Sequence, residues 1–350
     1  YFHEEKKVSY TCSACGNKEK VSIYSGRLKL NWRVDWPAKW AIYNTTCEPA
    51  GKDHSVKGGA YDTGIELSQL LYDYEGPVKV PYEWLRLGDR DMKTSKGIVF
   101  TPRKYLKMAD PRIYRSIILR TDPMKHISFR IEELSQYYDY YEKMEEIFYN
   151  PSLAESEEER LFFHYLYPLT RITEIPEAKP TRIPFKYLTF LAQMQNILSI
   201  EDLYEKAMDA IEGKEEIQKF PIVRFEKLLK RTENWLHQVE SLIENEEDKK
   251  RKYEMRKKVI LFHIPHEVDQ SLAGDLSPEQ LKAILSLKTY ISQNEKLNAE
   301  EIQNRVFDIA KMELEIPPKK VFQAIYKILL GKRFGPRLGS FLTMLDRKWL

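Results

Sequence analysis

A short polar loop in the first third of the chain carries the residue types needed to handle a polyphosphate. Residues 93–97 read Lys-Thr-Ser-Lys-Gly, with Lys93 and Lys96 three positions apart and the Ser95 hydroxyl just before the second lysine. Two ammonium groups on a loop can stabilise the charge that develops as a triphosphate breaks. The same run also fits a solvated surface loop, so the neighbouring motifs must decide between the two interpretations.

A turn upstream of this loop has the composition of a nucleoside-binding site. It reads Gly51-Lys52-Asp53-His54 and follows a short segment with strand character. Glycine allows a ligand to approach the backbone, and an acid at the carboxyl end of a strand can accept hydrogen bonds from ribose hydroxyls. His54 could face the same ligand, although a structural histidine satisfied by its neighbours is the alternative.

Tryptophans are dense just before this turn, at positions 32, 36 and 40. Trp36 and Trp40 are four residues apart, share one helix face and are predicted to be core. Asp35 is predicted to cap that helix, with Pro37 in its first turn. Trp32 then precedes the helix at the end of a strand, where the ligands of open α/β sheets gather.

A Cys-x-x-Cys pair near the start of the chain could provide half of a zinc site. Cys12 and Cys15 flank a tight turn closed by glycine, and two thiolates so spaced supply two of the four ligands of a tetrahedral zinc. The other two ligands would come from a segment before the first residue, or from His3 and Cys47. Two reduced thiols on a turn are the alternative, whereas no strand-to-helix pattern follows the pair to support a redox role.

Positive charge is concentrated at the end of the chain. The 350 residues carry a net charge of +3, but residues 317–350 contain eight lysines and arginines and one acid, which leaves −4 elsewhere. The turn at 331–339 combines three glycines and a proline with Lys332, Arg333, Phe334 and Arg337. It is predicted to bind phosphates and a stacked base, and a helix–helix turn that happens to be basic fits equally well.

Composition and periodicity predict a soluble α/β region followed by helices. Apolar residues make up 42% of the chain, and no run is long enough to span a membrane. Three cysteines without a framework pattern indicate a reducing compartment. Strands are predicted at 20–24, 27–30, 45–47, 78–85 and 98–102, and a helix at 55–71. Later helices are predicted at 111–119, 131–148, 157–166, 184–195, 201–213, 220–231, 233–243, 249–261, 278–292, 299–311, 318–330 and 337–345.

The motifs, in their order and spacing, resemble those of class I lysyl-tRNA synthetases of the archaeal type. The segments that carry the resemblance are 32–37, 48–54, 59–64, 93–97 and 330–339. Each motif is weak alone, but together they are specific, and the resemblance covers the whole chain. Thr94 and Gly97 depart from the Lys-Met-Ser-Lys-Ser loop of other class I synthetases.

The resemblance implies a role for each matching residue. Catalysis would fall to Lys93, Ser95 and Lys96, with Lys96 stabilising the departing pyrophosphate. Gly51, Asp53, Lys93 and Lys96 would bind ATP with its Mg²⁺. The resemblance further assigns the lysine substrate to Trp32, His54 and Tyr82, tRNA to Lys332, Arg333 and Arg337, and structural zinc to Cys12 and Cys15.

The resemblance also implies a fold. We expect an α/β region followed by an all-α region: the C-terminal half of a Rossmann-type catalytic domain with a zinc-knuckle insertion, then a helical cage that binds the anticodon. Expected segments are 1–26 for the zinc insertion, 27–101 for the nucleotide-binding half, 102–150 for a helical region contacting the tRNA stem, and 151–350 for the anticodon-binding domain.

The function implied is ATP-dependent activation of lysine and its transfer to tRNA(Lys) by a cytoplasmic monomer that binds no membrane. The His-Ile-Gly-His-like signature of class I synthetases is absent, and the chain begins with tyrosine. We therefore expect a C-terminal fragment that is inactive alone. The alternatives are a non-catalytic tRNA-binding fragment or paralogue, and a glutamyl-type class I synthetase.

Overall fold

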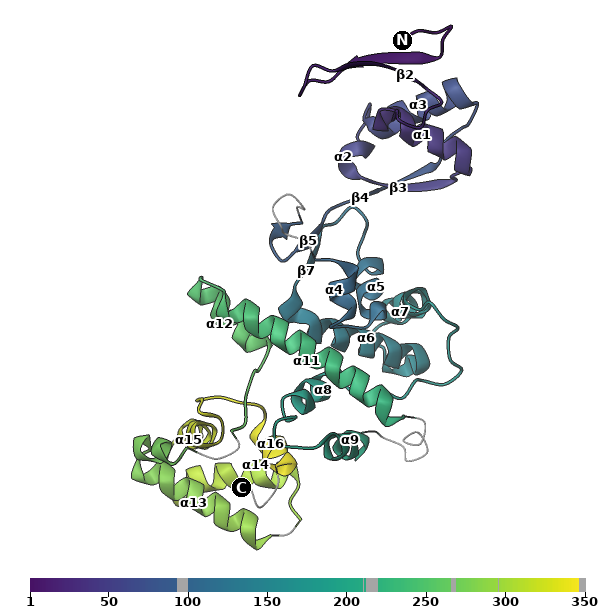
Figure 1. Cartoon of the computed structure of the whole chain (residues 1–350). Helices are drawn as coiled ribbons and strands as arrows, with labels where there is room; N and C mark the ends of the chain where they lie inside the picture. The colour runs from purple at the N-terminus through teal and green to yellow at the C-terminus, as the bar shows by residue number, and fades with distance from the viewer. Residues whose placement is uncertain (93–99, 210, 212–219, 266–268, 295, 346–350) are drawn as a thin grey trace. The chain divides into compact units, whose positions relative to one another are not determined.

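The structure, a computed structural model, describes the whole chain except residues 93–99, 210, 212–219, 266–268, 295 and 346–350 (Figure 1). Contacts divide the chain into two compact units, one of residues 1–86 and 121–127 and the other of residues 87–120 and 128–350. The first unit mixes strands and helices and the second is mainly helical, as predicted. The finer four-segment division stays a prediction.

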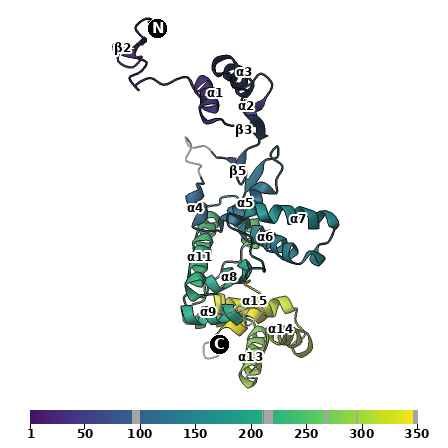
Figure 2. The same ribbon diagram turned by 90° about the vertical axis from the view of Figure 1, so that its right-hand side faces the viewer.

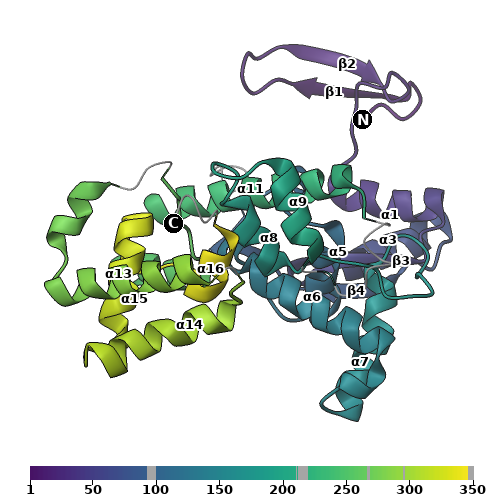
Figure 3. The same cartoon turned by 90° about the horizontal axis from the view of Figure 1, so that it is seen from below.

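The first unit opens with an antiparallel hairpin (Figure 3). Strand β1 (Lys7–Thr11) pairs with β2 (Lys18–Ser22), in register from Lys7 opposite Ser22 to Thr11 opposite Lys18. The strand predicted at 27–30 is wrong, because these residues form no ladder. Their alternating pattern is local, whereas a strand also requires a hydrogen-bonded neighbour.

Helix α1 (Trp32–Tyr43) begins earlier than predicted. Its N-cap is Asn31, whose side-chain oxygen accepts a hydrogen bond from the Arg33 N–H at 3.0 Å. The prediction that Asp35 caps the helix is therefore wrong, and Pro37 lies inside the helix rather than in its first turn. Trp32 is accordingly the first helical residue, not the end of a strand.

A parallel pair of strands forms the centre of the first unit. Strand β3 (Cys47–Gly51) pairs with β4 (Val78–Tyr82), and helices α2 (Lys52–Ser55) and α3 (Ala60–Tyr72) make the crossover that a parallel pair requires. The core consists of Trp40, Ala50 and Tyr61, with Trp36, Ile65 and Tyr74 packed against it. The prediction of a core residue is confirmed for Trp40, whereas Trp36 is partly buried and packs against the core.

A small sheet follows, with the strand order β6-β5-β7. Its members are β5 (Leu85–Leu87), β6 (Arg90–Asp91) and β7 (Ile127–Phe129). The strand predicted at 98–102 lies partly outside the described residues, and its end is instead the start of helix α4 (Pro102–Leu106). Thr101 caps α4 by accepting a hydrogen bond from the Lys104 N–H at 3.3 Å.

The second unit is built from helices packed in pairs. Helix α11 packs on α8, α6 on α7, α14 on α16 and α13 on α15 (Figures 1, 2 and 3). No helix in the described part of the chain has the length and apolar character needed to cross a membrane. The helices are α5 (Pro111–Leu119), α6 (Leu134–Tyr149), α7 (Glu157–Thr170), α8 (Phe185–Ala192), α9 (Ile200–Asp209), α11 (Ile222–Glu244), α12 (Lys249–Lys258), α13 (Pro278–Gln293), α14 (Ala299–Asp308), α15 (Pro318–Leu330) and α16 (Leu338–Met344).

The two helices predicted at 220–231 and 233–243 are one continuous helix, α11. The segment contains neither glycine nor proline, and the Thr232 hydroxyl donates back to the Leu228 carbonyl at 2.9 Å within the same helix. Trp235 lies just beyond the predicted break, is 1% exposed, and donates its indole N–H to the Ile131 carbonyl at 2.8 Å. Tertiary packing therefore keeps α11 helical across the predicted break between residues 231 and 233.

Candidate functional site

The carboxyl ends of β3 and β4 lie side by side in the first unit, because Gly51 is paired with Tyr82. The backbone at Gly51 has φ −53°, which any residue adopts, and a Cβ there would meet no atom within 4 Å. By contrast, a Cβ at Gly59 would lie 2.7 Å from the His54 carbonyl oxygen. Packing therefore explains Gly59, whereas the open space at Gly51 leaves its backbone accessible to a ligand.

Trp32 and Trp36 form an apolar surface with His54. The Trp32 and His54 rings lie 5.5 Å apart in an edge-on arrangement, and the Trp36 ring is 6.1 Å from the same imidazole. Trp32 is 46% exposed and Tyr82 is 47% exposed, which leaves much apolar ring surface uncovered. The His54 side chain makes ring contacts but no hydrogen bond within the described residues. These features suit a ligand more than a satisfied structural histidine.

An acid next to this surface contacts a lysine and a histidine. The Lys52 ammonium donates to the Glu83 carboxylate, and the His126 Nδ1 lies 3.3 Å from the same carboxylate. The bond from Lys52 holds the pKa of Glu83 below its ordinary value. Sequence reasoning missed Glu83 and His126, which are 43 positions apart. An acid directly after the carboxyl end of β4 was the available signal for Glu83.

The remaining predicted nucleotide residues fall on α2 and on the lysine loop. Asp53 is exposed on α2, and its carboxylate makes no ion pair with any described residue. It therefore keeps its full capacity as a hydrogen-bond acceptor. Lys93, Ser95 and Lys96 lie outside the described residues, so their predicted roles remain predictions.

The cysteine pair lies on the turn of the β1–β2 hairpin. The Gly16 N–H donates to the Cys12 carbonyl and the Cys12 N–H to the Asn17 carbonyl, both at 2.8 Å. Backbone N–H groups of Cys15 and Ala14 then lower the pKa of the Cys12 thiol. This turn fits two ligands of a metal site, because it stabilises a thiolate.

No group of three or more metal-binding side chains occurs within the part of the chain that the structure describes. The alternative in which His3 and Cys47 complete the cysteine site is therefore not formed there. The His3 ring instead contacts Tyr1 at 5.8 Å, and Cys47 is an exposed residue at the start of β3.

The glycines of the basic turn in the second unit have structural explanations. Gly331 ends α15 in the left-handed region with φ +63°. A Cβ at Gly335 would lie 2.7 Å from the Tyr326 ring, and one at Gly339 would lie 1.9 Å from the Ala299 carbonyl oxygen. Backbone conformation therefore explains Gly331 and close packing explains Gly335 and Gly339, so these glycines carry no argument for ligand binding.

The cations of the same turn remain accessible. The Lys332 ammonium donates to the Leu261 carbonyl at 3.2 Å, while Arg333 and Arg337 are exposed and form no ion pair with described residues. Arg337 also lines a groove of about 580 Å³. Its other walls include Lys186, Phe190, Trp235, Lys258 and Phe262. Cations beside an apolar groove are the chemistry that binds phosphates and stacks bases.

Comparison with known proteins now adds to this geometry. Residues 1–169 match the family described as tRNA synthetases class I (K). The chain is 35% identical over 366 residues to the lysine–tRNA ligase of Methanocaldococcus jannaschii and 32% identical over 368 residues to that of Methanococcus maripaludis. The chain is therefore similar in sequence to the lysine–tRNA ligases of these two organisms. The lysine–tRNA ligase of Archaeoglobus fulgidus is 33% identical over 352 residues and supports the same relationship.

The similarity covers all of this chain but not all of its relatives. The Methanocaldococcus and Methanococcus alignments include 100% of the chain and 64% of each relative. The Archaeoglobus alignment includes 99% of the chain and 61% of the relative. The chain thus spans a little under two thirds of the length of these ligases.

Proposed function

We propose that this chain is part of a class I lysine–tRNA ligase that activates lysine with ATP and transfers it to tRNA(Lys). The observation that carries the proposal is the edge where β3 and β4 end. There, the open backbone at Gly51 lies beside Tyr82, and His54 lies against Trp32. The relatives reported above are named lysine–tRNA ligases, and their name supports lysine as the amino-acid substrate.

The chemistry at this edge is a substitution at phosphorus. A carboxylate oxygen of lysine attacks the α-phosphorus of ATP, a new P–O bond forms, and the bond to pyrophosphate breaks. Lys93 and Lys96 neutralise the charge on the leaving pyrophosphate, and Ser95 supports the loop that carries them. A ribose hydroxyl of tRNA then attacks the lysyl carbonyl and displaces AMP. Positioning and charge therefore account for most of the catalysis.

The two substrates are assigned to two sets of residues at this edge. Gly51 and Asp53 bind the nucleoside, because an open backbone and an unpaired carboxylate suit a ribose. Trp32, His54 and Tyr82 bind lysine, whose aliphatic stem can lie against aromatic rings while its ammonium gains from their π faces. Mg²⁺ accompanies the triphosphate as its counter-ion.

Two further contacts complete the proposal. Cys12 and Cys15 supply two thiolate ligands to a structural zinc, which would fix the hairpin turn. Lys332, Arg333 and Arg337 bind the tRNA backbone as part of the helical anticodon-binding domain, in keeping with their exposure and with the position of Arg337 in the groove wall. The location that follows from this role is the cytoplasm, and the proposed form is a monomer.

The test is ATP–pyrophosphate exchange by the complete product of the gene, with lysine or glutamate as the amino acid. We expect lysine-dependent exchange, and Asp53→Asn should raise the KM for ATP with little effect on the KM for lysine. Exposed Asp308, which makes no ion pair with described residues, provides the control Asp308→Asn, which should change neither.

Each other outcome of this test has a definite meaning. Exchange that depends on glutamate would replace the proposal with a glutamyl-type synthetase. No exchange with either amino acid, together with tight binding of tRNA(Lys), would instead indicate a non-catalytic tRNA-binding protein. Protein purified without chelators should contain about one zinc per cysteine turn, and Cys12→Ser should remove it.

A further inference from the structure

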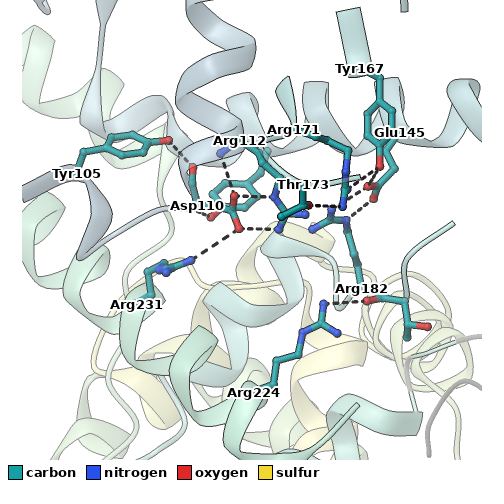
Figure 4. Close-up of polar contacts among 12 residues, drawn as sticks. Tyr105, Asp110, Arg112, Glu145, Tyr167, Arg171, Thr173, Arg182, Arg224 and Arg231 are labelled. Carbon is teal, nitrogen blue, oxygen red and sulfur yellow. Dashed lines mark hydrogen bonds and ion pairs between the residues drawn. The ribbon is translucent and has the colours of Figure 1, made fainter. Parts of the chain in front are cut away.

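A second cluster of charged residues lies inside the helical unit, away from the strand edge described above. Four arginines, at positions 112, 182, 224 and 231, line a cavity of about 120 Å³, which we call the arginine cavity (Figure 4). They come from the first turn of α5, from the segment between α7 and α8, and from α11. The volume is sufficient for several waters or one tetrahedral oxyanion.

Two of these arginines are fixed in place by carboxylates. Arg112 donates its Nε and Nη2 to Asp110, at 2.8 and 2.7 Å. Arg182 donates its Nε and Nη2 to Glu145, which is 1% exposed (Figure 4). Both pairs are bidentate, so each guanidinium is held rigidly. The Nη1 group of each has no hydrogen-bond acceptor among the described residues and remains able to donate.

The other two arginines leave positive charge that the described carboxylates balance poorly. Arg231 reaches Asp110 only at 3.9 Å, on a carboxylate that already binds Arg112. Arg224 donates only to the Thr181 carbonyl, at 3.5 Å, and forms no ion pair with a described carboxylate (Figure 4). Arg224 is also the most exposed of the four. Like charges gathered this way favour an anion between them.

The remaining acid in the lining reduces this excess very little. Glu142 accepts the Phe185 N–H at 3.0 Å and forms no ion pair with a described cation. Burial raises the pKa of Glu142, and burial followed by the neighbouring Arg182 and Arg112 lowers the pKa of Arg224. The shift of Arg224 has the direction expected where positive charges gather, whereas the shift of Glu142 reflects its burial.

A buried hydroxyl in the lining is also without a partner. Tyr141 is 1% exposed, lines the arginine cavity, and its hydroxyl makes no hydrogen bond within the described residues. The nearby Thr170 donates its own hydroxyl to the Tyr167 carbonyl at 2.7 Å. A buried hydroxyl without a partner costs free energy, so its presence in the wall of a cavity points to a ligand.

We propose that the arginine cavity is an oxyanion site whose ligand is a phosphate group. Arg112 and Arg182 would donate from their Nη1 groups, Tyr141 from its hydroxyl, and Arg224 would supply the charge without a carboxylate partner. Guanidinium groups held in fixed planes match the oxygen geometry of phosphate. Two sources share this chemistry, free inorganic phosphate and a phosphodiester of bound RNA. Only the phosphodiester of bound RNA depends on the proposed ligase function.

Arg224→Gln tests the site without breaking an ion pair to any described residue. The thermal midpoint of the 350-residue chain would be measured while sodium phosphate replaces sodium chloride at constant ionic strength. We expect a saturable rise for the unchanged chain, and Arg224→Gln should weaken phosphate binding by about ten- to a hundredfold. The matched control is Arg256→Gln on α12, an exposed arginine that forms no ion pair with described residues and should leave the response unchanged.

Tyr141→Phe provides an independent variant, which should weaken phosphate binding without lowering the midpoint measured in chloride. The proposal is overturned if Arg224→Gln and Tyr141→Phe both respond to phosphate as the unchanged chain does. This measurement involves neither tRNA nor lysine, so its failure is distinct from a failure of the proposed ligase function.

The salt dependence of tRNA(Lys) binding then distinguishes the two sources of phosphate. If a phosphodiester occupies the cavity, Arg224→Gln should reduce the slope of log affinity against log salt by about one. An unchanged slope, together with a lost response to phosphate, identifies the free anion as the ligand.

Discussion

The strand edge of the first unit and the arginine cavity of the second differ in the exposure and the pairing of their polar groups. At the edge, Trp32 and Tyr82 are about half exposed and Asp53 has no ion-pair partner among described residues. At the cavity, the lining residue Arg182 donates two hydrogen bonds to Glu145, which is 1% exposed. The first arrangement leaves exposed groups ready for a ligand, whereas the Arg182–Glu145 pair ties the segment between α7 and α8 to helix α6.

The difference teaches that exposed groups without partners and buried ion pairs respond differently to substitution. An exposed residue without partners can be replaced at little cost to the folded state, so its loss is felt in binding or rate. A buried ion pair is costly to break, because the surviving charge has no solvent. Substitutions at the edge should therefore change kinetics, and substitutions among the buried pairs should change stability.

The largest expected effect lies in the buried network. Glu145→Gln should lower the free energy of unfolding by about 3–5 kcal/mol, because it leaves the Arg182 guanidinium buried beside a neutral amide. Urea unfolding measures the change. The control Glu155→Gln removes an acid that is 79% exposed and pairs with Lys143, and should cost less than about 1 kcal/mol. Equal effects of the two variants would contradict the contrast between the regions.

The next effect concerns the lysine loop. Lys96→Ala in the complete gene product should slow lysine activation by about a hundred- to a thousandfold, because one preorganised charge is lost from the leaving pyrophosphate. Lysine affinity should barely change, since the interaction belongs to the transition state. Single-turnover kinetics at several lysine concentrations would separate the two quantities. Normal turnover with weakened lysine binding would instead favour the interpretation of residues 93–97 as a solvated surface loop.

A smaller effect is expected at the aromatic surface. Trp32→Ala should raise the KM for lysine by about tenfold, equivalent to about 1.4 kcal/mol, through loss of ring contact. Because Trp32 is 46% exposed, the thermal midpoint of the Trp32→Ala variant should stay close to that of the unchanged protein. Trp40, which is 1% exposed in the same unit, provides the opposite case. Trp40→Ala should cost about 3–5 kcal/mol of stability.

The smallest effect is a dependence on pH. The hydrogen bond from Lys79 at 2.8 Å, aided by the Gly58 N–H, holds the pKa of Asp62 below its ordinary value. A depressed folded-state pKa gives stability that is present above the unfolded-state pKa and is lost as the pH falls through the folded-state value. Thermal midpoints measured from pH 7 downwards should therefore show Asp62→Asn below the unchanged protein at neutral pH.

The gap between these two proteins should close at acid pH, below the ordinary range of aspartate. Asp53→Asn is the matched control, because Asp53 is exposed on α2 and has no ion-pair partner among described residues. Its midpoint should follow that of the unchanged protein at every pH. A gap for Asp62→Asn that persists at acid pH would show that the Lys79 pair does not cause it.

The amino-acid sequence by itself determined much of the local structure and gave the resemblance to a family. Helices α5 and α15 have the bounds that were predicted, since proline at the first helical position and apolar periodicity lie within the segments themselves. The spacing of Trp36 and Trp40 also predicted that they share the inner face of one helix, where Trp40 is a core residue and Trp36 packs against the core. The motif residues likewise depend on short stretches of chain, which is why they indicated the synthetase family before any fold was known.

Only the tertiary structure decided which distant residues meet. The contact of Glu83 with Lys52 and His126, and the gathering of Arg112, Arg182 and Arg224 around one cavity, join positions that no local period connects. Packing also carried α11 through a stretch where the local pattern predicted a break. Capping and periodicity act over a few residues, whereas burial and charge pairing act between elements that the whole fold must first bring together.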